Sequence, residues 1–371
     1  MNKHVIRNSD RNAFKNCRRA WDWKSPLRRN LIPRVTPKPL EFGIAWHIAL
    51  AFYYNPDTWH LRSEPAKWIA VEEGTIRTFV DAVKEQKKKY EEDRDLFIEL
   101  EEDFNERLEL GQKMLRAYFA WSLEHDTFTV RKVEVGFEVP IPDPRSPTEQ
   151  LWMPSPDNSS SWPVVYQGRL DGIVTDPQGW NWLKEHKTTG QFGDMKHLDL
   201  DEQLTSYGWA LRQVGVNVRG ALYTEALKDF SKGVKVLQSR RQGRLLSVNK
   251  QSRITFEEFK QAVVDYGEDP NDYIDHLAYL QGKPNPFFRR FAQFRTTQEY
   301  DEIGTRIGWE AIDMLSTDTP LYPNPGRFNC SFCSFREPCL AFNQGNDSEF
   351  LLKELFIKGE TRVIEVDTKY E

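Results

Sequence analysis

Two acidic residues and a lysine are placed where they can do hydrolytic chemistry. Asp171 lies in a Gly-Arg-Leu-Asp-Gly segment, and Glu185 and Lys187 lie two apart in Glu-His-Lys. Alternate residues of a strand share a face, and a hairpin turned near Gln178 would put Asp171 opposite residues 185–187. Two such carboxylates suit Mg²⁺ or Mn²⁺, which prefer oxygen ligands and keep several waters. The lysine would orient or deprotonate the attacking water and neutralise charge in the transition state.

A charge pair on a solvent-facing hairpin is the alternative interpretation of Glu-x-Lys. The flanking residues are apolar, however, and an unpaired carboxylate on a half-buried strand is costly. These flanking residues are Val164, Val165, Leu170, Ile173, Val174, Trp180, Trp182 and Leu183. A shared cation is therefore favoured.

The four cysteines form a second group. Cys17 stands alone, and Cys330, Cys333 and Cys339 follow as C-x₂-C-x₅-C. Four thiolates can hold a tetrahedral Zn²⁺ or a [4Fe–4S] cluster, and either would tie the N-terminal segment to the C-terminal region. A zinc ribbon normally supplies two close pairs, so the isolated Cys17 favours iron–sulfur, with zinc left open.

Three further polar residues have less specific patterns. His47 lies four residues after Gly43 on an apolar segment, where a hydrogen-bonded core histidine is the commoner case. Gln203 and Tyr207 are four apart on a predicted helix and project from one face. There they would bind phosphates or stack a base. A packed tyrosine beside a solvated glutamine is equally common.

The elements that must position these residues follow from hydrophobic periodicity. Helices are predicted over 41–54, over 81–123 as one long amphipathic helix or a helical pair, over 201–214 and from 255 to 266. Strands are predicted over 129–139, 164–174, 180–188 and 220–227, with a turn at 176–179, an irregular segment at 18–39 and a long surface loop at 140–163. This order predicts an α/β fold whose central mixed sheet has three meandering strands and a fourth reached through a helical crossover.

Composition limits the class of protein. The 39% apolar content allows a sizeable core, and neither a signal peptide nor a membrane-spanning apolar run is present, so we expect a soluble, cytoplasmic protein. The net charge is −5, but residues 1–40 hold eleven Lys/Arg against two acids, and residues 228–253 hold eight against one. Such segregation is expected where one face meets a polyanion. The acidic block at 71–110 is interpreted as solvated surface.

Together these residues resemble the RecB-type iron–sulfur branch of the PD-(D/E)XK nuclease superfamily. This branch includes the AddB nuclease domain, CRISPR-associated spacer-processing exonucleases and related phage exonucleases. The resemblance implies that His47, Asp171, Glu185 and the backbone carbonyl of His186 are metal ligands. It also implies that Asp171, Glu185 and Lys187 are catalytic.

The same resemblance also has implications for DNA binding and for the cysteines. It implies that Gln203 and Tyr207 bind the strand near the scissile phosphate, and that Cys17, Cys330, Cys333 and Cys339 hold a [4Fe–4S] cluster. Basic residues of the two basic segments are candidates for backbone contacts: Arg18, Arg19, Arg28, Arg29, Arg240, Arg241 and Arg244. The proline that names the superfamily is replaced by Leu170, and the acidic block carries no family motif.

We therefore predict a metal-dependent DNA nuclease of the exonuclease type, encoded by a cell or by a phage acting in its host's cytoplasm. Its substrate would be DNA that is single-stranded or has an end, and its partner a helicase, recombinase or integrase. The expected fold is a nuclease core with a helical insertion after the first core helix and an iron–sulfur-stapled C-terminal lobe. The predicted regions are 1–40, 41–127, 128–270, 271–345 and 346–371. A DNA-binding or scaffolding module with an inactive nuclease fold and a zinc or iron–sulfur site is the alternative.

Overall fold

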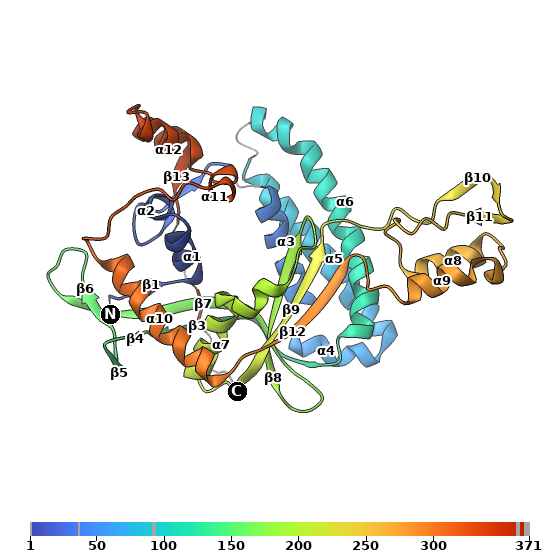
Figure 1. Cartoon of the computed structure of the whole chain (residues 1–371), viewed down its shortest axis with the longest axis horizontal. Helices are drawn as coiled ribbons and strands as arrows, with labels where there is room; N and C mark the ends of the chain where they lie inside the picture. Colours follow the sequence, from blue (N-terminus) through green and yellow to red (C-terminus); the bar gives the residue numbers. More distant parts are fainter. Residues whose placement is uncertain (1, 36–37, 91–93, 361–363, 367–371) are drawn as a thin grey trace.

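A mixed β-sheet forms the centre of the computed structural model, which describes all residues except 1, 36–37, 91–93, 361–363 and 367–371 (Figure 1). The long strand β7 (Ser161–Thr175) pairs with β3 (Thr129–Pro140) along one edge. Along its other edge it pairs first with β1 (His4–Ile6) and then with β8 (Asn181–Thr189).

The outer strands complete the sheet. The chain crosses through helix α7 (Glu202–Gln213) to β9 (Val218–Leu227), which is parallel to β8, and β12 (Phe288–Phe294) pairs with β9 in the antiparallel sense. The predicted meander and helical crossover are confirmed. So is the turn between β7 and β8, where the N–H of Gly179 donates to the carbonyl of Asp176 at 3.0 Å and Gly179 has a φ of 87°.

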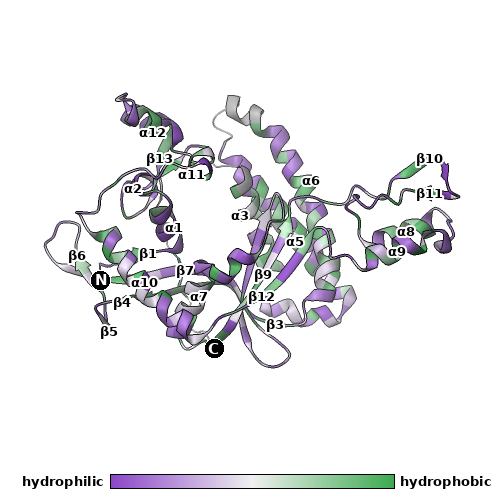
Figure 2. Cartoon of the chain, in the orientation of Figure 1, coloured by the Kyte–Doolittle hydropathy of each residue, from purple (hydrophilic) through white to green (hydrophobic). Residues whose placement is uncertain are grey.

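Helices cover both faces of the sheet and enclose two apolar cores. On one face pack α3 (Lys38–Tyr53), α5 (Pro65–Lys88) and α6 (Arg94–His125). On the other lie α1 (Asn8–Asn16), α7 and α10 (Thr297–Leu315). Of the two alternatives predicted for the region 81–123, one long helix or a helical pair, the structure has the pair, and its first helix begins earlier, at Pro65. In Figure 2 the central strands are hydrophobic along much of their length, whereas α6 alternates hydrophobic and hydrophilic residues, as expected for an amphipathic covering helix.

Two predictions of irregular structure are wrong. The segment 18–39 contains α2 (Arg18–Lys24) and β2 (Leu31–Pro33). Its prolines begin at Pro26 and so limit the helix without preventing it. The predicted loop at 140–163 contains the short strands β4 (Pro142–Asp143), β5 (Ser146–Gln150) and β6 (Trp152–Pro154). Prolines are tolerated in such edge strands, and the buried Leu151 anchors the segment through an N–H that donates to the carbonyl of Ile141 at 2.8 Å.

Two peripheral units complete the molecule. Between β9 and β12 the chain forms the hairpin β10 (Val236–Arg241) and β11 (Arg244–Leu246) and the helices α8 (Phe256–Asp265) and α9 (Ile274–Gln281), which project from one side in Figure 1. The C-terminal lobe holds α11 (Arg327–Ser331), α12 (Arg336–Asn343), α13 (Ser348–Leu355) and β13 (Phe356–Lys358). β13 pairs with β2, which joins the two ends of the chain. The five predicted regions remain a prediction.

No helix among the described residues is long and apolar enough to cross a membrane.

Candidate metal and catalytic site

Three side chains from three elements meet at the face of the sheet covered by α3. His47 projects from α3, and its Nδ1 lies 3.1 Å from Oδ1 of Asp171, on β7. Glu134, on β3, completes the group: the three residues each offer a ligand atom, and these atoms all lie within 4.8 Å of one another. Among the described residues, this is the one group of three or more His, Cys, Asp or Glu side chains that is so close. It therefore forms the candidate metal site.

Glu134 reaches the site because β3 and β7 are in register there. Val133 pairs with Gly172 and Val135 with Leu170, so Glu134 stands opposite Asp171 on the neighbouring strand. Its φ is 49°, in the left-handed region that costs a residue with a Cβ roughly 1–2 kcal/mol. Strain of this kind is held in place by surrounding structure and is common at functional sites.

Glu185 and Lys187 lie beside this group on β8 and share a face, as predicted. Lys187 Nζ donates to Oε1 of Glu185 at 2.5 Å, and the amide of Gln203 on α7 donates to the same oxygen at 2.8 Å. Glu185 is only 2% exposed. Its role as a metal ligand stays a prediction, since the three closest ligand atoms come from other residues.

His186 holds the aspartate from the backbone. Its N–H donates to Oδ2 of Asp171 at 2.6 Å. Its buried ring stacks on Tyr54 with centroids 5.4 Å apart and contacts Lys184 Nζ. Ligation by the carbonyl of His186 remains a prediction.

The charges in the site oppose one another. Burial alone would raise the pKa of Asp171, but His47, Lys187 and the backbone N–H of His186 lower it. Burial alone would lower the pKa of His47, yet Asp171 raises it. Burial, followed by repulsion from Asp171, raises the pKa of Glu185 to about 7, and the same two causes raise the pKa of Glu134. Crowded carboxylates of this kind are relieved by a shared cation, so this donor set fits Mg²⁺ or Mn²⁺.

Lys187 carries a permanent positive charge in this setting. Burial would lower its pKa, but Glu185 and Asp171 raise it above the usual value. An ammonium group has three donors and no acceptor. Of the two roles expected for the lysine, this charged form suits orienting water and neutralising charge rather than removing a proton.

A comparison with protein families decides what kind of site this is. The sequence profile of the PD-(D/E)XK nuclease superfamily matches residues 9–340. The chain belongs to this superfamily. No curated protein sequence matches the chain. Membership implies a nuclease that cleaves phosphodiester bonds of a nucleic acid, and it agrees with the α/β core and the acidic metal group. It does not distinguish the RecB-type iron–sulfur branch from others.

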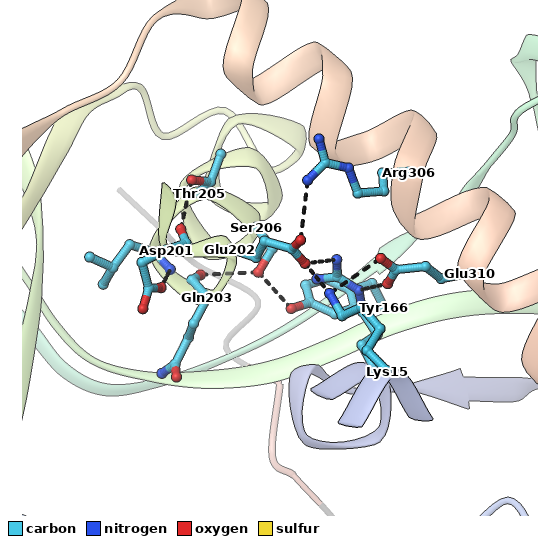
Figure 3. A network of polar contacts seen from close by, with 11 residues as sticks. Lys15, Tyr166, Asp201, Glu202, Gln203, Thr205, Ser206, Arg306 and Glu310 are labelled. Atoms are coloured by element: carbon cyan, nitrogen blue, oxygen red, sulfur yellow. Dashed lines mark hydrogen bonds and ion pairs between the residues drawn. The ribbon is translucent and has the colours of Figure 1, made fainter. Parts of the chain in front are cut away.

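Helix α7 places the predicted DNA-binding residues of this PD-(D/E)XK core. Its first turn is anchored because Glu202 accepts from Arg11 at 2.9 Å and from Arg306 at 3.1 Å. Figure 3 shows the side chain of Gln203 pointing away from that network, and its amide contacts Glu185. Tyr207 is 9% exposed and packs edge-on against the ring of Phe137. Their predicted DNA contacts are not tested by the structure.

The arginines predicted to contact DNA are mostly engaged within the protein. Arg28 pairs with Asp22 and Arg29 with Glu349. Arg18 lies over the rings of Phe14 and Tyr322, and Arg19 donates to Asn343 at 2.7 Å and lies over Phe342. Arg240 pairs with Glu268, whereas Arg241 is exposed. Binding of DNA by these residues stays a prediction.

The cysteines lie where the two ends of the chain pack together, but they do not form a coordination group. Cys17 joins α1 to α2, and the other three lie on or beside α11 and α12. A tetrahedral zinc site would hold its sulfurs roughly 3.8 Å apart. No three of these four sulfurs, all in described residues, lie within 4.8 Å of one another. Neither an iron–sulfur staple nor a zinc site is therefore shown.

Glu134 is the site residue that sequence reasoning missed. It was placed on the correct strand, but no short turn links β3 to β7, so the sequence offers no register between them. The register also shifts between Val130 and Lys132. The strand carries two acids, Glu134 and Glu138, and only its register with β7 shows that Glu134 is the one opposite Asp171.

Proposed function

We propose that this chain is a metal-dependent DNA nuclease, of the exonuclease type, that hydrolyses phosphodiester bonds with a metal-activated water. One observation carries the proposal: the ligand group of His47, Glu134 and Asp171 lies beside the Lys187–Glu185 pair within a PD-(D/E)XK core. An inactive nuclease fold would have no reason to keep these charged groups together on buried strands.

Mg²⁺ or Mn²⁺ would be held by His47, Glu134 and Asp171, with Glu185 as a further oxygen ligand. When bound, such an ion polarises the phosphoryl oxygen and lowers the pKa of a bound water. Groups of the protein itself stabilise the developing charge and hold the ligands in place. Lys187 presents a fixed ammonium to charge that develops on the phosphate. The amide of Gln203 and the N–H of His186 hold Glu185 and Asp171 in place.

The finer parts of the proposal concern the substrate and its surroundings. DNA that is single-stranded or has an end would enter along the predicted contact residues Gln203 and Tyr207. A helicase, recombinase or integrase would act beside the nuclease, in the cytoplasm of the cell or of a phage's host.

A [4Fe–4S] cluster in the C-terminal lobe is also part of the proposal. Three sulfurs already accept N–H donors, as cluster ligands commonly do: Cys17 from Asn324 at 3.4 Å, Cys330 from Gly326 at 3.5 Å and Cys339 from Arg19 at 3.8 Å. Burial raises the pKa of the Cys333 thiol, and the other three cysteines raise it further, so each of them lies within electrostatic reach of Cys333. A cluster held by these four sulfurs would brace α2 against α12.

Cleavage of end-labelled DNA tests the proposed function. Protein purified without air is expected to shorten labelled single- or double-stranded DNA with Mg²⁺ or Mn²⁺ and to be silent in EDTA. Asp171→Asn should lose this activity while remaining folded by circular dichroism. Cleavage that is unchanged in EDTA, or equal in Asp171→Asn, would contradict the proposal.

A further inference from the structure

The segment between β9 and β12, residues 228–287, forms an arm with a core of its own. Six buried apolar side chains between residues 246 and 280 pack on each other in a cluster separate from the two cores of the sheet: Leu246, Ile254, Phe259, Val263, Tyr273 and Leu280. In Figure 1 the hairpin β10–β11 lies above α8 and α9, and the whole arm projects beyond α6. Such a unit is larger than a connection between neighbouring strands needs.

The arm is rooted beside the catalytic residues. Lys187 on β8 pairs with Glu225 on β9, and the arm starts three residues later at Lys228, about 10 Å further along the strand. The returning chain enters at the same place, since the N–H of Leu227 donates to the carbonyl of Phe287 at 2.8 Å. Both connections of the arm to the sheet therefore lie close to the strand that carries Glu185 and Lys187.

Charge is separated within the arm. Residues 232–253, which include the hairpin, carry seven Lys/Arg and no acid, whereas residues 254–279 carry seven Asp/Glu and one Lys. Lys232, Lys235, Arg241 and Lys250 are exposed. Within the part of the chain that the structure describes, neither these four nor Arg244 forms an ion pair with a carboxylate. The hairpin thus presents uncompensated positive charge, which suits a polyanion.

The hairpin is held rigidly in this position. The buried carboxylate of Glu268 accepts from Arg240 at 2.5 Å, from the N–H of Leu245 at 3.0 Å and from the hydroxyl of Tyr273 at 2.7 Å. Gln242 and Gly243 turn the chain with φ values of 52° and 82°, the signs of a type I′ turn. Arg240 therefore serves the fold, and the free cations are left to bind.

Two lysines next to the hairpin contact the same aromatic ring. Lys250 Nζ and Lys283 Nζ lie 4.7 Å and 4.4 Å from the ring centroid of Tyr279, and no described carboxylate pairs with either. Lys283 also lines a cleft of about 730 Å³ between the arm and α6, whose charged lining is mixed: Lys113, Arg116, Glu124, Glu257 and Glu258. Lys283 Nζ donates to the backbone carbonyl of Lys250 at 3.1 Å, so neither ammonium group is neutralised by a described carboxylate and each is able to bind a phosphate.

We infer that this arm grips duplex DNA, so that the substrate of the nuclease has a double-stranded segment next to the strand that is cut. A two-stranded β-ribbon fits the major groove, and residues 232–253 contain no aromatic residue on which unpaired bases would stack. The inference rests on the proposed function, because it names that function's substrate.

Binding in EDTA, where no cleavage is expected, tests the inference. The triple variant Lys235→Gln, Arg241→Gln, Arg244→Gln is compared with the control Lys67→Gln, Arg145→Gln, Lys260→Gln, which removes equal charge at exposed sites off the hairpin. Fluorescence anisotropy follows a 30-base-pair duplex and an oligo(dT) of 30 nucleotides over a range of KCl. The triple variant should bind the duplex at least about tenfold more weakly, and the slope of log K against log[salt] should fall by roughly 2.7. Its affinity for oligo(dT) should stay within about twofold, and the control should match the wild type.

The single variant Arg241→Gln repeats the test with a change that should leave the fold intact, because Arg241 is exposed and pairs with no described carboxylate. It should lower the salt slope by about 0.9. Equal losses on duplex and oligo(dT) would overturn the inference in favour of single-strand binding. Unchanged duplex binding would also overturn the inference, and an acidic protein would then replace DNA as the expected ligand of the hairpin. If the wild type cuts no DNA yet the triple variant loses duplex binding, the proposed function fails and the arm's role stands.

Discussion

The carboxylates of Glu134 and Asp171 stand opposite each other on paired strands, in the same ligand group as His47. Two anions in register repel, and Glu134 also carries a left-handed backbone conformation. In the metal-free protein the repulsion is offset in part, because His47 Nδ1 lies 3.1 Å from Asp171 and a guanidinium nitrogen of Arg169 lies 3.5 Å from Glu134. A shared cation would offset it further. The two carboxylates therefore lower the stability of the metal-free protein and raise its affinity for a metal ion.

Glu134→Gln should stabilise the metal-free protein and weaken its binding of metal. Removing one of the two charges is expected to raise the melting temperature in EDTA by a few degrees, on the order of 1 kcal/mol. The same change should weaken the stabilisation by Mn²⁺ at least about tenfold in concentration, measured by thermal shift. Glu149→Gln, at an exposed site on β5, is the control and should change neither. A variant that binds Mn²⁺ as the wild type does would exclude Glu134 from the site.

Lys187→Ala should separate catalysis from binding. The ammonium faces developing charge, so its loss is expected to cost at least about 10²- to 10³-fold in cleavage rate. Affinity for DNA in EDTA should change less than about threefold. Lys196→Ala, an exposed lysine beyond β8, is the control. Full activity in Lys187→Ala would refute the assigned role.

The stability of the metal-free protein should fall as pH rises. Glu185 has a folded pKa of about 7 and an ordinary value of 4.5, so between these values the folded state holds a proton that the unfolded state has released. The contribution is then lost as pH increases through this window, on the order of 2 kcal/mol. His47 acts in the same direction, since its raised pKa marks a charged pair with Asp171 that is lost at higher pH.

Urea denaturation between pH 5 and pH 8 in EDTA measures this effect. Glu185→Gln should flatten the profile, and Mn²⁺ should stabilise the wild type more at pH 8 than at pH 5, because its ligands must be deprotonated. A wild-type profile that rises across the window would contradict the buried, protonated Glu185.

The cysteines should yield a coloured protein. Protein purified without air is expected to absorb broadly near roughly 400 nm, as iron–sulfur proteins do, whereas Zn²⁺ is colourless. Cys17→Ser should abolish the absorbance and lower the melting temperature, because Cys17 supplies the link to the N-terminal segment. Ser331→Ala, between two of the cysteines, is the control. Colourless protein containing one zinc per chain would replace the cluster with a zinc site.

The site residues that lie on one strand, or on two strands joined by a short turn, could be predicted from the sequence. Glu185 and Lys187 share a face because they are two apart on one strand, and Asp171 meets them through the short turn ending at Gly179. Residues that meet across long separations were placed only by the family resemblance, as His47 was, or missed, as Glu134 was. Packing sets those contacts, and a register shift in β3 hides them from any pattern in the sequence.

Prolines and other turn-forming residues led to wrong predictions of irregular structure where packing and strand pairing stabilise regular elements. The strands β4 to β6 form in a proline-rich segment because Ile141 and Leu151 bury their side chains and share a backbone hydrogen bond. Helix α2 forms before the first proline because Trp21 and Trp23 are buried. Proline density predicted where regular structure is interrupted, but not that it is absent.

A buried ion pair beneath the site should matter far more than the surface pairs. Asp126 and Arg290 are joined at 2.7 Å with side chains 0% and 11% exposed, and Tyr54 donates to the same carboxylate at 2.8 Å. Asp126→Asn would leave Arg290 charged and buried without its partner, a loss of about 3–5 kcal/mol. Asp143→Asn, in the exposed pair with Arg145, should cost far less, because solvent screens that pair. Urea denaturation of both variants checks the contrast. Equal costs would show that Asp126 is hydrated in solution and that the support beneath His186 comes from packing alone.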